Sequence, residues 1–187
     1  MDPGSELRRL REELDALKGG TKNKLSMIVF SGDLDKLLAA FIIATGAVAM
    51  GLEVVMFFTF WATPALRDKK KKAGGKDLFG KMFGLMLPRG AGKVKLSKMN
   101  MGGTGTAMIK HLMKKRNIAS LEEMISLAAD LEVKIYICDM SMGLMGFKPE
   151  EMIAYPGVEF VGVAKFLEEA GDSKIQQLLR FGDAFFD

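Results

Sequence analysis

The chain has 187 residues, of which 49% are hydrophobic and 27% charged, so it can form one well-buried core and is too apolar to be disordered throughout. Its single cysteine excludes an internal disulfide framework and is typical of a reducing compartment. The net charge of +4 reflects short basic runs at residues 69–72 and 114–116, which we interpret as solvated loops rather than a nucleic-acid site. A charged amino terminus and apolar runs too short to span a membrane predict a cytoplasmic protein.

The first 24 residues form a separate appendage in this interpretation. Residues 1–5 look like a cloning remnant. A narrow apolar stripe then recurs every three or four residues, at Leu7, Leu10, Leu14 and Leu17, and predicts an amphipathic helix that ends at the two glycines 19 and 20. Such a short helix is marginal alone, so we expect it to pack on its own domain or on another copy, making the protein a homo-oligomer.

A strand–helix–strand pattern opens the main domain, which we place at residues 25–170. Leu25 to Phe30 is a short apolar run with β-branched residues, and Glu53 to Phe60 is another. Between them, Asp33 is suited to cap a helix that runs to about Gly51. This βαβ unit predicts parallel pairing and a right-handed crossover, hence an α/β fold.

The turn Ser31-Gly32-Asp33 lies at the amino end of that helix. It lacks both the three-glycine dinucleotide motif and the Walker ending, so nucleotide binding has little support. Its backbone N–H groups can favour a carboxylate or an anionic sulfur species. The simpler alternative is that Asp33 only caps the helix.

Aromatic residues follow the second strand. Phe57, Phe58, Phe60 and Trp61 predict an aromatic wall at the carboxyl edge of the sheet, with Trp61 available to line a pocket. Packing of the same rings in the core is the alternative.

Residues 69–105 predict a methionine-rich insertion or lid. A helix is expected from Asp77 to Leu87, and Pro88 ends it. This basic, apolar piece can cover a pocket, face another subunit or make a peripheral contact with a membrane. A helix at Thr106–Arg116 follows; its His111 has no second histidine and no cysteine pair, so we expect no metal site and no cofactor.

The stretch VKIYICDMSMGLMG places the cysteine. Apolar residues alternate up to Cys138, which predicts a strand, and Asp139, Ser141 and Gly143 predict a turn or a helix cap. Cys138 would then lie where loops gather and ligands bind, its thiol meeting solvent and the amino end of the next helix, which favours the thiolate. Asp139 and Ser141 are candidates to orient it, or they simply form the turn. A buried, inert cysteine is the alternative.

The remaining elements are shorter. Ser120 and Glu123 form a capping-box pattern that opens a helix to about Leu131. Beyond the cysteine, a strand is expected at Val158–Val161 and a helix at Val163–Ala170. Residues 171–187 are expected to form a docking segment.

Four motifs, SGDLDK, AFIIATGAVAMGLEVVMFFTFW, KMNMGGTGTAMIKHLMKK and VKIYICDMSMGLMG, resemble the DsrE/DsrF/DsrH-like family, in its methionine-rich, single-cysteine branch sometimes labelled peroxiredoxin-like. The resemblance covers about Leu25 to Ala170. It implies a flavodoxin-like three-layer fold, homo-oligomers and a cysteine that carries sulfane sulfur as a persulfide, a role that falls on Cys138. Relatives often have an arginine where this chain has Met145, before Gly146.

Two functions follow. The first is a sulfur carrier or sulfurtransferase, with sulfur-donor and acceptor proteins or low-molecular-weight thiols as partners. The second is a non-catalytic oligomeric adaptor that docks on a membrane or a redox enzyme through the methionine-rich segment. Peroxide reduction ranks last, because Cys138 is not preceded by the Thr-x-x pattern of peroxiredoxins.

Overall fold

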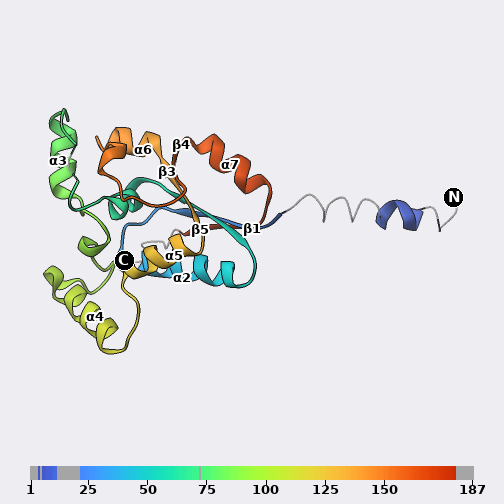
Figure 1. Ribbon diagram of the computed structural model, residues 1–187, viewed down its shortest axis with the longest axis horizontal. Helices are drawn as coiled ribbons and strands as arrows, with labels where there is room; N and C mark the ends of the chain where they lie inside the picture. Colours follow the sequence, from blue (N-terminus) through green and yellow to red (C-terminus); the bar gives the residue numbers. More distant parts are fainter. Residues whose placement is uncertain (1–3, 5, 12–21, 72, 180–187) are drawn as a thin grey trace, which may run out of the picture.

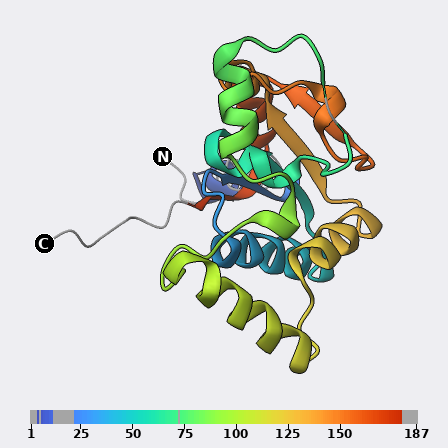
Figure 2. The same cartoon turned by 90° about the vertical axis from the view of Figure 1, so that its left-hand side faces the viewer.

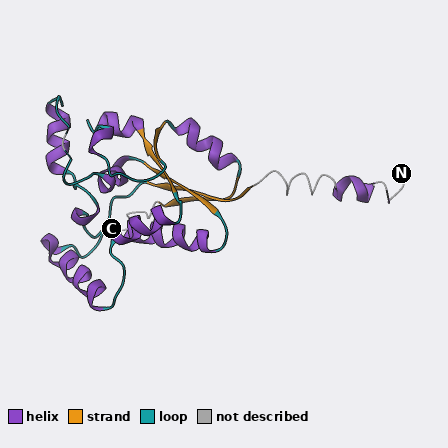
Figure 3. Cartoon of the chain, in the orientation of Figure 1, coloured by secondary structure: helices purple, strands orange, loops and turns teal. Residues whose placement is uncertain are grey.

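The computed structural model describes residues 4, 6–11, 22–71 and 73–179. Its centre is a fully parallel five-stranded sheet in the order β4-β3-β2-β1-β5 (Figures 1 and 3), which confirms the predicted α/β class. The strands are β1 (Lys22–Val29), β2 (Glu53–Phe58), β3 (Lys134–Cys138), β4 (Val158–Val161) and β5 (Ser173–Leu179).

Helices connect the strands and cover the sheet. The α-helices that connect and flank the strands are α2 (Leu34–Ala49), α3 (Leu78–Met86), α4 (Thr104–Lys115), α5 (Leu121–Asp130), α6 (Asp139–Leu144) and α7 (Val163–Gly171). The 3-10 helices are η1 (Phe60–Leu66), η2 (Ala91–Lys93), η3 (Met101–Gly103) and η4 (Pro149–Glu151). Residues 6–11 are helical, and the rest of the expected amino-terminal stripe lies outside the described residues.

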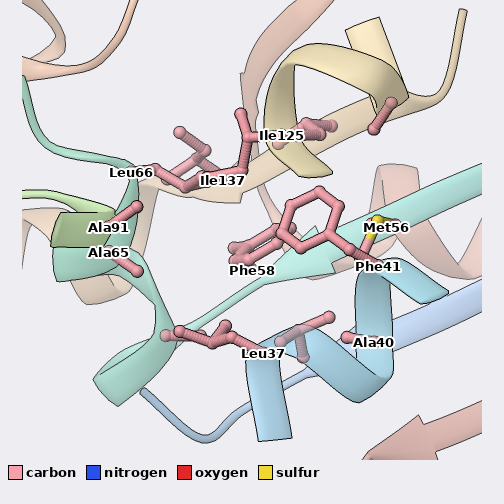
Figure 4. Packing of buried hydrophobic residues seen from close by; sticks show 14 of the residues in the cluster. Leu37, Ala40, Phe41, Met56, Phe58, Ala65, Leu66, Ala91, Ile125 and Ile137 are labelled. Atoms are coloured by element: carbon pink, nitrogen blue, oxygen red, sulfur yellow. The ribbon is translucent and has the colours of Figure 1, made fainter. Parts of the chain in front are cut away.

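The two faces of the sheet have separate apolar clusters. On one face, Leu37 and Phe41 of α2 and Ile125 of α5 pack against Phe58 and Ile137 of the strands (Figure 4). On the other face, α7 covers a smaller cluster that includes Phe57 and Tyr136. The alternation of side chains along each strand therefore produces three layers, as predicted.

Several elements match their sequence signals. The Ser120–Glu123 capping box is present and opens α5 at Leu121. Asp77 caps α3 by accepting a hydrogen bond from the N–H of Gly80 at 2.8 Å. The β1–α2–β2 unit has the expected parallel pairing.

Of the turn and the helix cap expected after Cys138, the structure has the start of a helix, because α6 begins at Asp139 with Cys138 at its N-cap position. Two expectations differ from the structure. Residues 173–179, expected to be part of a docking segment, form β5 at the edge of the sheet beside β1. Asp33 occupies the N-cap position of α2, but its side chain makes no capping hydrogen bond.

Helix α3 of the predicted insertion and helix α4, which follows the insertion, lie at one end of the molecule, away from the sheet (Figure 1); Figure 2 looks at this end directly. Helix α3 reaches the body through a very close contact, because a Cβ at Gly146 would lie 2.5 Å from the Cα of Gly80. No helix among the described residues is long and apolar enough to cross a membrane.

Candidate functional site at the carboxyl edge of the sheet

Cys138 is the last residue of β3, as predicted, and lies at the carboxyl edge of the sheet beside Val161 of β4. The loops that leave β1 and β2 at the same edge contribute residues 30–33 and η1. Since parallel strands share their carboxyl ends, these loops and the start of α6 form one neighbourhood around the end of β3.

The thiol of Cys138 is covered rather than open. Cys138 is only 4% exposed and belongs to a cluster with Phe57 and Tyr136 of the strands and with Phe166 of α7. The rings of Phe57 and Phe166 stack at a centroid distance of 4.9 Å. The expectation that the thiol of Cys138 meets solvent is therefore wrong, because α7 packs across the face of the sheet to which Cys138 belongs.

Helix α7 is held unevenly. Near its carboxyl end, Glu169 pairs with the buried Lys24 and accepts a hydrogen bond from the hydroxyl of Tyr136 at 3.0 Å. The hydrogen bond from Lys24 holds the pKa of Glu169 below its usual value, and burial together with Glu169 raises the pKa of Tyr136. At its amino end, residues 163–165 are exposed, and Phe166 is the first buried side chain.

Ser141 holds the backbone next to Cys138 through a side-chain hydrogen bond. Its hydroxyl donates to the carbonyl of Cys138 at 3.0 Å and lies 3.4 Å from the hydroxyl of Thr63 in η1. Both hydroxyl side chains are fully buried. They join α6 to η1, so Ser141 supports the site through the backbone. The sequence analysis did not predict Thr63; its only local signal is that a threonine stands inside an apolar run directly before Pro64.

The turn Ser31-Gly32-Asp33 packs against the same 3-10 helix. A Cβ at Gly32 would lie 2.0 Å from the carbonyl oxygen of Trp61, so only glycine fits there. The hydroxyl of Ser31 donates to the carboxylate of Asp33 at 2.9 Å, and Lys36 pairs with the same carboxylate at 2.9 Å. Asp33 is thus engaged with its own turn and its own helix.

The four aromatic residues do not form one wall. Phe57 alone joins the cluster around Cys138, whereas Phe58 faces the opposite layer and packs on Phe41. Phe60 packs on Phe30 at 5.4 Å. Trp61 is 50% exposed and lies on the outside of η1, where a ligand or partner can reach it.

Asp139 follows Cys138 directly but is exposed, and its carboxylate accepts a hydrogen bond from the N–H of Met140 at 2.6 Å. The described residues contain no group of three or more His, Cys, Asp or Glu side chains that could hold a metal ion. Around the end of β3 lie the thiol of Cys138, the buried hydroxyls of Ser141 and Thr63, and the exposed carboxylate of Asp139.

A buried ion cluster that we did not predict fixes the base of the insertion. The guanidinium of Arg67, directly after η1, pairs with Glu151 at 3.1 Å and lies over the ring of Phe147. Lys76, just before α3, pairs with the same carboxylate. Burial opposes the charge of Glu151, but the hydrogen bonds from Lys76 and Arg67 outweigh it and lower its pKa. The pairs join residues 84 and 75 positions apart, so no local pattern reveals them.

The sequence matches the DsrE/DsrF/DrsH-like family over residues 21–178. The chain belongs to this family. Within it, the chain is 42% identical over 152 residues to the "Uncharacterized protein YrkE" of Bacillus subtilis, covering 81% of this chain and 94% of the relative. It is 38% identical over 158 residues to the "Sulfur carrier protein DsrE2" of Allochromatium vinosum, covering 82% and 96% respectively.

The fold of this DsrE-like chain also has a counterpart among solved structures. The ychN protein of E. coli superimposes with a TM-score of 0.52 at 10% identity, over 83% of this chain and 98% of that one. At such low identity the likeness concerns the fold alone, and it agrees with the flavodoxin-like layers expected from the sequence.

Proposed function

We propose that this DsrE-like protein is a sulfur carrier that holds sulfane sulfur as a persulfide on Cys138. The main support is the family, which includes a relative named as a sulfur carrier at 38% identity. The position of the chain's single cysteine at the carboxyl end of a central strand agrees with this role, because ligands of open α/β sheets bind at that edge. Sulfur-relay chemistry then needs a donor, an acceptor and this one thiol.

The transfer is balanced without an external oxidant or reductant. The thiolate of Cys138 attacks the outer sulfur of a donor persulfide, the S–S bond of the donor breaks, and the donor leaves as a thiolate. An acceptor thiolate then attacks the outer sulfur on Cys138, and the Cys138 thiolate is released. The chain has no second cysteine to resolve the persulfide as an internal disulfide, so the sulfur is held until an acceptor thiol arrives. Donor and acceptor are other proteins or low-molecular-weight thiols.

The buried thiol requires that its cover opens before each transfer. The amino-terminal half of α7 is suited to move, because Phe166 is its only buried side chain before Ala170. The carboxyl-terminal half stays anchored through Glu169, Lys24 and Tyr136. Lifting the first turns of α7 would uncover Cys138 without disturbing the sheet.

Loading with sulfur tests the carrier function. The full chain is treated with inorganic polysulfide, desalted and measured by intact-mass spectrometry. We expect a gain of one sulfur atom that a thiol reductant removes, and no gain for Cys138→Ser. Because the chain has a single cysteine, a gain that survives in Cys138→Ser, or no gain in the wild type, overturns the proposal.

A second candidate is a non-catalytic adaptor, and the burial of Cys138 is the observation that favours it. If the cover never opens, the cysteine is only a small core residue. The exposed apolar side chains of α3 would then carry the function as a docking surface. The same loading experiment separates the two candidates, because an adaptor acquires no sulfur.

A further inference from the structure

Charge is distributed very unevenly along this chain. Residues 69–116 contain 14 lysine and arginine residues but a single acid, Asp77. The rest of the chain has 13 basic and 22 acidic residues and is therefore net acidic. The overall charge of +4 hides this separation. The basic part corresponds to the end of the molecule that carries α3 and α4 (Figure 2).

Helix α3 turns its large apolar side chains outward at this basic end. Its inner side carries small residues, with Gly80 buried against Gly146 and Gly84 close to Arg67. Its outer side carries Leu85, which is 89% exposed, and Phe79, which is 64% exposed, together with the exposed Leu78, Met82 and Met86. Two and a half turns of helix therefore present five large apolar side chains to the surroundings, far beyond the scattered single residues normal for a protein surface.

Polar contacts with the body of the protein fix the position of α3. Lys76, at the entry to the helix, pairs with the buried Glu151, and Arg67 donates to the carbonyl oxygens of Gly84 and Pro88 at 3.4 Å. Because both ends of α3 are held by these contacts with the body, its apolar side chains keep a fixed orientation toward the surroundings.

The charge of this end discriminates between possible occupants. A second copy related by a two-fold axis would bring the same basic segment against itself, and like charges oppose such a contact. Nucleic acid would satisfy the lysines but not the five apolar side chains. Anionic lipid satisfies both, since apolar side chains enter the boundary of the acyl chains while lysines meet the headgroups.

We propose that α3 and the surrounding basic segment form a peripheral binding surface for anionic membranes. Leu78, Phe79, Met82, Leu85 and Met86 insert at the headgroup boundary, and exposed lysines such as Lys70 and Lys81 contact the headgroups. This inference stands apart from the chemistry of Cys138, because vesicle binding is measured without any sulfur donor.

Vesicle flotation of the full chain tests the proposal. Binding is expected to vesicles of phosphatidylcholine mixed with phosphatidylglycerol, to weaken with added salt, and to be lost on phosphatidylcholine alone. Phe79→Glu should weaken binding by at least about tenfold, because the ring can no longer be buried. Lys81→Gln should weaken it by about fivefold.

Matched substitutions elsewhere serve as controls. Leu167 on α7 is 60% exposed, close to the value for Phe79, and Lys174 on β5 is exposed outside the basic segment. Leu167→Glu and Lys174→Gln should leave vesicle binding unchanged. The proposal is overturned if anionic vesicles are not bound, or if the controls weaken binding as much as the α3 variants do. It is also overturned if duplex DNA displaces the vesicles, or if light scattering shows an oligomer that Phe79→Glu dissociates.

Discussion

Removing the ring of Phe166 should expose Cys138 to reagents. In the structure this ring stacks on Phe57 at 4.9 Å and shares the cluster of the thiol. It is also the only buried side chain in the first part of α7. Opening that part of the helix therefore costs mainly the burial of one aromatic side chain, about 2 kcal/mol. Phe166→Ala removes most of this cost and should raise the population of the open state by roughly 30-fold.

The assay is the rate at which a chromogenic disulfide reacts with the thiol at neutral pH. The signal is unambiguous, because Cys138 is the only cysteine of the chain. We expect the rate to rise by roughly 30-fold in Phe166→Ala. Leu167→Ala, which removes an exposed neighbour on the same helix, should change it by less than about threefold.

Global unfolding has to be separated from local opening, since Phe166→Ala also lowers the free energy of unfolding, by up to about 3–5 kcal/mol. A local opening exposes little surface, so its rate depends weakly on urea, whereas reaction through global unfolding rises steeply with urea. Equal acceleration in Leu167→Ala, or a rate that follows global unfolding in the wild type, would refute the view of α7 as a cover.

Three further predictions concern the stability of the framework. Glu151→Ala leaves Arg67 buried without its partner and should lower the free energy of unfolding, measured by urea titration, by about 3–5 kcal/mol. As a control, Glu168→Ala breaks the exposed pair with Lys165 and should lower it by less than about 1 kcal/mol. The pKa of Glu151 is lowered in the folded state, so its contribution to the free energy of unfolding is present above the ordinary pKa of glutamate and is lost as the pH falls through the lower folded value. Glu151→Gln should therefore make the free energy of unfolding depend less steeply on pH in the acid range. An unchanged pH dependence contradicts the pairing. Gly32→Ala should destabilise by about 1–3 kcal/mol because of the contact with Trp61, whereas Gly46→Ala, at an open position in the last turn of α2, should be neutral or stabilising in the same titration.

Most elements of the fold could be predicted from local sequence patterns. The apolar run before Ser31, the capping box at Ser120 and the alternation before Cys138 each depend on neighbouring residues, and each element lies where these signals indicate. The sequence did not decide between a turn and helix α6 after Cys138, because Asp139, Ser141 and Gly143 compete for the backbone in the same way in turns and at helix starts. Strand β5 has no clear alternation, and its pairing with β1 joins segments far apart in the sequence.

The environment of the cysteine could not be predicted in the same way. The position of Cys138 at the end of β3 is a local property, but the cluster in which it is buried includes Phe166, which lies 28 residues later in the chain. The link between Thr63 and Ser141 and the ion cluster of Arg67, Lys76 and Glu151 also join distant segments. Such contacts depend on how the layers pack, and no periodicity within one element records them.

The most direct test of the account is a transfer measurement on the loaded protein. The full chain is first charged with isotopically labelled sulfane sulfur and freed of donor, and then mixed with a low-molecular-weight thiol. If Cys138 is a carrier, the label leaves the protein and appears as the outer sulfur of the acceptor persulfide, while the cysteine returns as a free thiol. Label that never attaches to Cys138, or that stays on it in the presence of excess acceptor, contradicts the account.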